Sequence, residues 1–115
     1  MDDNCLFCKI IKGEIPSTKV YEDDKTYAFR DINPEAPVHV LVVPKKHIED
    51  LMHLENEDNE YKVAIFDAIK EVAKKENITE SGFRIISNNG EDAGQSVKHL
   101  HIHVVGGKKL GTNVV

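Results

Sequence analysis

The sequence lacks an excess of basic residues. Its 115 residues include 15 Lys and Arg against 20 Asp and Glu, which gives a formal net charge of −5. Nucleic-acid binding normally requires a basic surface, so we expect no nucleic-acid partner. A site for a small anionic ligand is still compatible with this charge, because such a site needs only a few well-placed donors.

The sequence also lacks a long apolar run. No segment approaches the ~20 consecutive apolar residues that span a bilayer, so we expect no membrane partner. The first residues, Met1 to Asn4, are acidic and polar, unlike the basic start of a signal peptide, and we therefore expect a cytoplasmic protein. The length, with 40% hydrophobic and 30% charged residues, predicts one domain over residues 1–115.

The spacing of apolar residues predicts an α+β fold. We expect a short helix over residues 5–11, one long helix over residues 59–76, and strands over residues 19–22, 26–30, 38–43, 83–87 and 98–105. Most strands follow one another, which favours an antiparallel sheet of about five strands over a βαβ design. The expected buried stripe of the long helix comprises Val63, Phe66, Ile69, Val72 and Ala73.

Three histidines alternate with apolar residues near the C-terminus. Side chains alternate along a strand, so His99, His101 and His103 share one face, while Leu100 and Ile102 face the core. Three interpretations compete: a solvent-exposed polar face, a zinc site, or phosphoryl chemistry in which a neutral imidazole is the nucleophile.

The segment before the histidines favours phosphoryl chemistry. Residues Gly94 to Val97 offer main-chain N–H groups and the Ser96 hydroxyl, donors that suit phosphate oxygens better than a metal ion. The sequence contains no Walker loop and no dinucleotide-binding glycine fingerprint.

Several segments together resemble a known family. Residues 94–107 (GQSVKHLHIHVVGG), 28–32 (AFRDI), 36–39 (APVH) and 42–47 (VVPKKH) are similar to the signatures of the histidine-triad (HIT) proteins. The similarity is to the Hint branch, the purine nucleoside phosphoramidases, and extends from about Cys5 to Gly107. It implies a HIT-like fold, a homodimer that meets partly through the long helix, and hydrolysis of nucleoside 5′-phosphoramidates to AMP without magnesium. Two alternatives are a dinucleoside polyphosphate hydrolase and a nucleotide-binding regulatory module.

The resemblance also implies a role for each matching residue. His101 would attack the α-phosphorus and carry the nucleotidyl group, while the carbonyl of His99 fixes its tautomer. His103 and Ser96 would hold phosphate oxygens or the leaving group, and His39 would complete the histidine cluster. The implied nucleotide-binding residues are Leu6, Phe7, Ile10, Phe29, Asp31, Ile32, Asn88, Gly94, Gln95, Ser96, Val97, His101 and His103.

Two groups of these nucleotide-binding residues have an alternative interpretation. Asp31 would accept hydrogen bonds from both ribose hydroxyls, but it is also a residue type that initiates turns. Leu6, Phe7, Ile10, Phe29 and Ile32 would line the base pocket, but are also ordinary core residues.

The two cysteines, Cys5 and Cys8, are separated by two residues, a spacing typical of a metal or redox pair in a reducing compartment. Some HIT proteins have this pair, and the resemblance implies a zinc site formed by Cys5, Cys8, His47 and His99. Four protein ligands would close the site, so the zinc would be structural. The alternatives are unliganded thiols and a redox pair, although no thioredoxin-like βαβ pattern follows.

The C-terminal segment departs from the family pattern. Residues 108–115 lack the tryptophan-bearing ending common in the Hint branch, where this tail shapes the leaving-group side of the pocket. A pyrophosphate leaving group would need basic side chains, which Lys98, Lys108 and Lys109 could supply. The sequence therefore leaves the leaving-group preference open.

Overall fold

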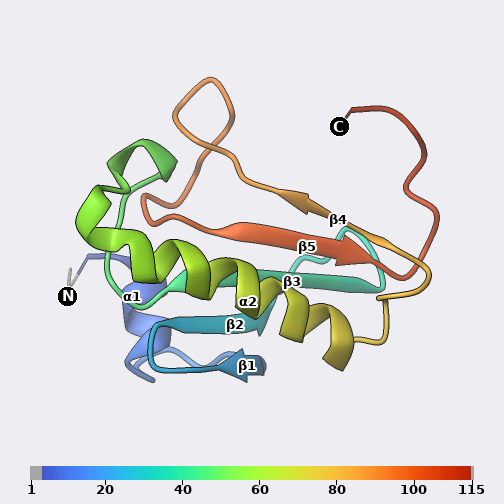
Figure 1. Cartoon of the computed structure of the whole chain (residues 1–115), viewed down its shortest axis with the longest axis horizontal. Helices are drawn as coiled ribbons and strands as arrows, with labels where there is room; N and C mark the ends of the chain where they lie inside the picture. Colours follow the sequence, from blue (N-terminus) through green and yellow to red (C-terminus); the bar gives the residue numbers. More distant parts are fainter. Residues whose placement is uncertain (1–3, 115) are drawn as a thin grey trace.

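A five-stranded antiparallel sheet with strand order β1-β2-β3-β5-β4 forms the centre of the structure, a computed structural model that describes residues 4–114 (Figure 1). The elements are α1 (Leu6–Ile11), β1 (Lys19–Glu22), β2 (Thr26–Arg30), β3 (Val38–Pro44), the 3₁₀ turns η1 (Leu51–His53) and η2 (Asn56–Asp58), α2 (Asn59–Lys75), β4 (Phe83–Ile86) and β5 (Ile102–Gly106). The expected α+β fold is confirmed. Of the expected domain, residues 1–3 and 115 lie outside the described residues.

Helix α2 covers one face of the sheet (Figure 1). Its buried residues are Ile65, Ala68, Ile69, Val72 and Ala73, which pack against the strands. The expected stripe was wrong at Val63 and Phe66, which are 62% and 63% exposed. These two side chains lie to one side of the i, i+3, i+4 row that meets the sheet, so apolarity alone assigned them to the wrong face. No helix within residues 4–114 combines the length and apolarity needed to cross a bilayer.

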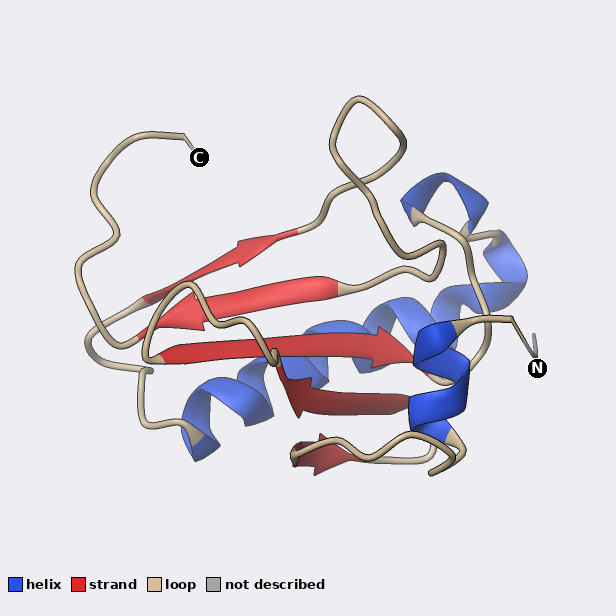
Figure 2. Cartoon of the chain, turned by 180° about the vertical axis from the view of Figure 1, so that it is seen from behind, coloured by secondary structure: helices blue, strands red, loops and turns tan. Residues whose placement is uncertain are grey.

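Within residues 4–114, the short helix α1 is the only helix on the opposite face of the sheet, and it lies at one end of that face (Figure 2). Phe7 and Ile10 of α1 pack with Phe29 of β2 and with Leu41 and Val43 of β3 in a second apolar cluster. The histidines expected on one face point to this side, because Leu100 and Ile102 belong to the core beneath α2.

Strand β5 is shorter than the expected strand over residues 98–105. It begins at Ile102, which pairs with Val42. In the residues just before β5, the N–H of Leu100 donates to the carbonyl of Ile48 at 2.7 Å. The carbonyl of His99 accepts from Nδ1 of His101. These main-chain groups are used outside the ladder, although the alternation of side chains continues.

Candidate functional site

His101 lies just before β5, and its side chain is buried. Its Nδ1 is 2.7 Å from the carbonyl oxygen of His99, which can only accept, so Nδ1 carries the hydrogen. The lone pair of the neutral ring is then on Nε2. The ring packs edge-to-face against Phe7, with 5.1 Å between ring centroids. The carbonyl contact implied by the family resemblance is therefore present, and His101 is a buried side chain, which excludes the solvent-exposed interpretation.

His103 lies next to His101, with 5.2 Å between ring centroids, and its Nδ1 is 2.9 Å from Nε2 of His39 on β3. Burial lowers the pKa of His103 to about 4, and the neighbouring His101 and His39 rings act in the same direction. His103 is therefore neutral at neutral pH. His39 joins the histidine cluster through His103, and Asp31 completes the group with Oδ2 at 3.4 Å from Nε2 of His39.

A hollow of about 670 Å³ opens beside this group, and Asp31, His39, Asn88 and His103 are among its lining residues. Oδ1 of Asp31 accepts from the main-chain N–H of Asn33 at 2.8 Å, so this residue does initiate a turn. Its other carboxylate oxygen, Oδ2, faces Nε2 of His39. The turn interpretation and the ribose interpretation are therefore compatible, because each uses a different carboxylate oxygen.

The segment Gly94 to Val97 does not gather around that hollow. The buried side-chain amide of Gln95 donates to the carbonyls of Glu49 and Val97 at 2.7 and 3.1 Å and accepts from the N–H of Gly90 at 2.9 Å. Ser96 is exposed and lines another hollow, of about 390 Å³, with Cys5, Leu6 and His47. Gln95 thus braces its loop, while Ser96 and Asn88 line different hollows.

The five apolar residues expected at a base pocket fall into two groups. Phe7, Ile10 and Phe29 are buried in the cluster behind His101, and Val97 packs against that cluster. Leu6 and Ile32 are 44% and 91% exposed, so they are not core residues. The base-pocket role of these two side chains stays a prediction.

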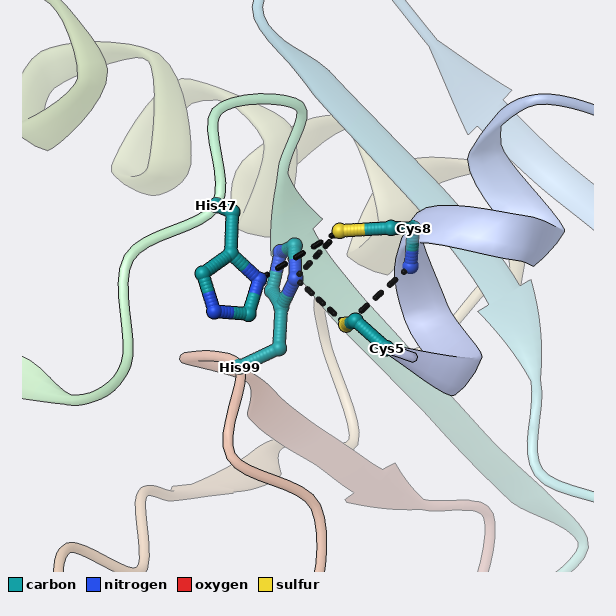
Figure 3. A group of neighbouring side chains, drawn as sticks. All are labelled: Cys5, Cys8, His47 and His99. Atoms are coloured by element: carbon teal, nitrogen blue, oxygen red, sulfur yellow. Dashed lines mark hydrogen bonds between the residues drawn. The ribbon is translucent and has the colours of Figure 1, made fainter. Parts of the chain in front are cut away.

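The second group of expected ligands, Cys5, Cys8, His47 and His99, does come together (Figure 3). Cys5 and Cys8 are at the start of α1, His47 follows β3, and His99 precedes β5. Their potential ligand atoms all lie within 4.8 Å of one another. The Sγ atoms of Cys5 and Cys8 are 3.3 and 3.5 Å from Nδ1 of His99, and Sγ of Cys8 is 3.3 Å from Nδ1 of His47.

These distances fit a tetrahedral metal ion. At the tetrahedral angle, zinc–ligand bonds of ~2.3 Å to sulfur and ~2.0 Å to nitrogen place sulfur and nitrogen about 3.5 Å apart. Nε2 of His99 donates to the carbonyl of Pro44 at 2.8 Å, so its Nδ1 lone pair faces the two sulfur atoms. Burial lowers the pKa of His99 to about 4, which keeps the ring neutral as a ligand must be. His99 thus connects the Cys/His group to the histidine cluster. Its ring contacts Cys5 and Cys8, and its carbonyl accepts a hydrogen bond from His101.

Three contributors were not found from the sequence. The carbonyl of Pro44 and the N–H of Glu35, which meets His39 at 3.0 Å, are main-chain groups that no residue type signals. Arg84 lines the same hollow as His103. Its position on β4, paired with Val105 of β5, could have indicated this.

The chain is similar to known proteins over nearly its whole length. The family model described as "HIT domain" matches residues 12–110. The structure of a HIT family hydrolase from Clostridium thermocellum is 45% identical with a TM-score of 0.97, covering 100% of both chains. The purine nucleoside phosphoramidase of Escherichia coli K12 is 40% identical over 111 residues, 96% of this chain and 93% of that protein. The 14 kDa zinc-binding protein of Zea mays is 45% identical over 111 residues, 95% of this chain and 86% of that protein.

Proposed function

Because the chain belongs to the histidine-triad (HIT) family, we propose that it is a hydrolase of nucleoside 5′-phosphoramidates, of the AMP–NH₂ and AMP–lysine type, with AMP as a product. The observation that carries this proposal is the 2.7 Å contact between Nδ1 of His101 and the carbonyl of His99, because it leaves a nucleophilic lone pair on Nε2. The similarity to the purine nucleoside phosphoramidase of Escherichia coli K12 supports the substrate class.

The proposed reaction has two displacements at phosphorus. In the first, the Nε2 lone pair of His101 forms a bond to phosphorus, the bond from phosphorus to the leaving amine breaks, and the amine takes up a proton. In the second, water attacks phosphorus, the bond to His101 breaks, and AMP leaves while the water proton is released. We assign the ribose contact to Asp31 and the proton relay to the leaving amine to Ser96, both on the match to the family motif. In this structure Ser96 lines a different hollow from Asp31 and His103.

A comparison of substrates tests the proposal. We expect a higher kcat/KM for adenosine phosphoramidate or an AMP–lysine conjugate than for diadenosine tetraphosphate. We also expect EDTA to leave turnover intact, because the proposed mechanism uses no magnesium. Both substrates are measured side by side with and without chelator. A preference for the dinucleotide would contradict the proposed substrate class.

A dinucleoside polyphosphate hydrolase is the second candidate, and one observation favours it. Arg84, Lys108 and Lys109 line the same hollow as His103, so three cationic side chains are near the place of a pyrophosphate leaving group. The substrate comparison separates the two enzymes. AMP binding without a His101-dependent rate would instead indicate a regulatory nucleotide-binding module.

The Cys/His group is proposed as a structural zinc site. Cys5, Cys8, His47 and His99 would supply four ligands and leave no open position, and two thiolates would neutralise the charge of the ion. Its contribution would be to fix α1 and the segment before β5 in place. The similarity to the 14 kDa zinc-binding protein of Zea mays supports the choice of metal.

We also propose that two copies of the chain associate through the side of α2 that faces β4. An apolar groove of about 720 Å³ lies there, with Phe66, Met52 and Ile85 among its lining residues. These three side chains are 63%, 78% and 45% exposed, a concentration of apolar surface that a partner would cover. A two-fold axis along this face would pair it with itself.

A further inference from the structure

The two cysteines enclose two side chains of the expected base pocket. Leu6 and Phe7 lie between Cys5 and Cys8 at the start of α1. Phe7 is buried and packs edge-to-face against the ring of His101, with 5.1 Å between ring centroids. Leu6 is exposed and lines the hollow of about 390 Å³. The conformation of this one turn therefore determines where both side chains lie.

The sulfur atoms of Cys5 and Cys8 are close together. Sγ of Cys5 accepts from the main-chain N–H of Cys8 at 3.3 Å. Both sulfur atoms lie within 3.5 Å of the same atom, Nδ1 of His99, and within 4.8 Å of each other. A disulfide bond holds two sulfur atoms at ~2.05 Å, and two intervening residues is the spacing of known dithiol–disulfide pairs. Joining these sulfur atoms would contract the turn that carries Leu6 and Phe7.

The two sulfur atoms differ in access. Cys5 lines the hollow of about 390 Å³, whereas Cys8 is fully buried. As zinc ligands, both would be held as thiolates, the form of cysteine that attacks a peroxide. A small oxidant that enters the hollow therefore meets Sγ of Cys5 first, with Sγ of Cys8 behind it.

We propose that Cys5 and Cys8 are a site of reversible oxidation, at which a peroxide converts the two thiolates into a disulfide, releases the zinc ion and weakens nucleotide binding. The weakened binding follows from the contracted turn that carries Leu6 and Phe7. The effect on the nucleotide rests on the proposed function, whereas disulfide formation rests on the contacts of the two sulfur atoms.

The oxidation balances in two steps with hydrogen peroxide. Sγ of Cys5 attacks one peroxide oxygen, the O–O bond breaks, and the products are a sulfenic acid on Cys5 and hydroxide. Sγ of Cys8 then attacks Sγ of Cys5, the S–O bond breaks, and a second hydroxide leaves. The two sulfur atoms thereby lose two electrons to the peroxide oxygens. A disulfide supplies no thiolate, so only His47 and His99 remain as ligands and zinc is released.

Oxidation and metal removal should have different effects on the nucleotide. The disulfide draws in the turn, and Phe7 transmits this movement to the ring of His101. Removal of zinc from reduced protein leaves the turn uncontracted, and Phe7 and Ile10 still hold α1 in its apolar cluster. We therefore expect the disulfide, and not the loss of the ion, to weaken AMP binding.

The oxidation is measured on the reduced, zinc-loaded full chain treated with hydrogen peroxide. Tryptic peptide 1–9 contains both cysteines and should lose about 2 Da, the mass of the two hydrogens of its thiols. A chromogenic chelator should register about one zinc released per chain. Dithiothreitol with added zinc should restore both values. Met52, which is exposed, serves as an internal control, because dithiothreitol does not reduce its sulfoxide.

AMP binding, measured by titration calorimetry, supplies the second readout. The oxidised protein should bind AMP about five-fold or more weakly than the reduced protein, and dithiothreitol should reverse the loss. Reduced protein stripped of zinc should keep most of its affinity. The double variant Cys5→Ser/Cys8→Ser is the matched control, because the sequence has only two cysteines and no disulfide can form. Peroxide should leave its affinity for AMP unchanged.

Several outcomes would overturn the proposal. One is a peptide 1–9 that gains oxygen on its cysteines without forming a disulfide. Another is a disulfide that leaves AMP affinity unchanged, and a third is an equal loss of affinity in the treated double variant. Reversal by dithiothreitol decides the matter within the wild-type chain even where the double variant fails to fold. Reduced protein that does not bind AMP would instead overturn the proposed function with the effect on nucleotide binding, and leave the oxidation site standing.

Discussion

The histidines of this protein differ in the main-chain group that each ring meets. The rings of His99 and His101 donate to carbonyls, those of Pro44 and His99, whereas the ring of His39 accepts from an N–H. One residue type thereby supplies a proposed metal ligand, a proposed nucleophile and a ring that accepts a hydrogen bond from the main chain. The sequence predicted that His101, and not its neighbours, is the nucleophile, but only through family resemblance. The main-chain group that each ring meets cannot be predicted from residue types.

The nucleophile is the first residue to test. His101→Ala should reduce turnover of adenosine phosphoramidate by several powers of ten, each worth ~1.4 kcal/mol of barrier, because no other lone pair replaces Nε2. Steady-state kinetics measure the loss, and circular dichroism checks the fold. The control is His101→Asn, which should still bind AMP, since Asp31 and Asn88 remain. Turnover near the wild-type rate in His101→Ala would remove the proposed mechanism.

The Cys/His group makes a separate prediction about metal content. Protein purified without chelator should contain about one zinc per chain. Cys5→Ser should lower the zinc content and reduce Tm by roughly 8 °C, the shift that ~2 kcal/mol produces in a domain of this size. Much of the catalytic rate should remain, because the ion does not touch the substrate.

Metal analysis and thermal unfolding measure these effects of Cys5→Ser. Lys9→Ser, in the same helix, is the control and should retain the metal. Absence of zinc even after incubation with the ion would contradict the proposed site and leave the proposed nucleophile untouched.

The individual elements were predicted unevenly, and the differences have physical reasons. Helices α1 and α2 and strands β1 to β3 lie within one residue of the expected bounds at each end, because their apolar periods are regular and turn residues separate them. Strand β5 was predicted too long, since residues 98–101 keep the alternation of a strand while their main-chain groups bond elsewhere. Val63 and Phe66 were placed in the core because a single sequence cannot distinguish a helix face covered by its own sheet from one left exposed.

The 3₁₀ turn η2, just before α2, contains a buried carboxylate. Oδ1 of Asp58 accepts from Nζ of Lys46, and Oδ2 accepts from the N–H of Glu55 at 3.0 Å. The bond from Lys46, followed by that from Glu55, lowers the pKa of Asp58 below its ordinary value. A pKa that is lower in the folded state contributes stability above the unfolded-state pKa of about 3.9, and this is lost as pH falls through the folded value.

Asp58→Asn should therefore lower the free energy of unfolding at pH 7, and the difference from wild type should shrink below about pH 4. Urea unfolding between pH 3 and pH 7 measures this difference. Asp67→Asn, on the exposed part of α2, is the matched control and should show little effect at any pH. A wild-type advantage that stays constant down to pH 3 would mean that the carboxylate charge does not stabilise this turn.

At the scale of the whole molecule, the exposed apolar groove beside α2 predicts association. Phe66→Asp should convert the proposed dimer into a monomer, because a charge would be buried without a partner at the interface. Size-exclusion chromatography with light scattering measures the mass in solution. Lys75→Glu, at the end of α2, is the control and should leave the mass unchanged. A wild-type chain that is monomeric at micromolar concentration would contradict the proposed interface.

The place of β5 has a consequence for synthesis of the chain. The strand lies between β3 and β4 in the sheet, yet it begins only at residue 102, and Cys5 meets His99 across 94 positions of sequence. A nascent chain that already has β1 to β3 therefore exposes the unpaired edge of β3 until residues 102–106 have left the ribosome. Such an edge can pair with other chains, so we expect a truncation before Ile102 to aggregate instead of folding in part.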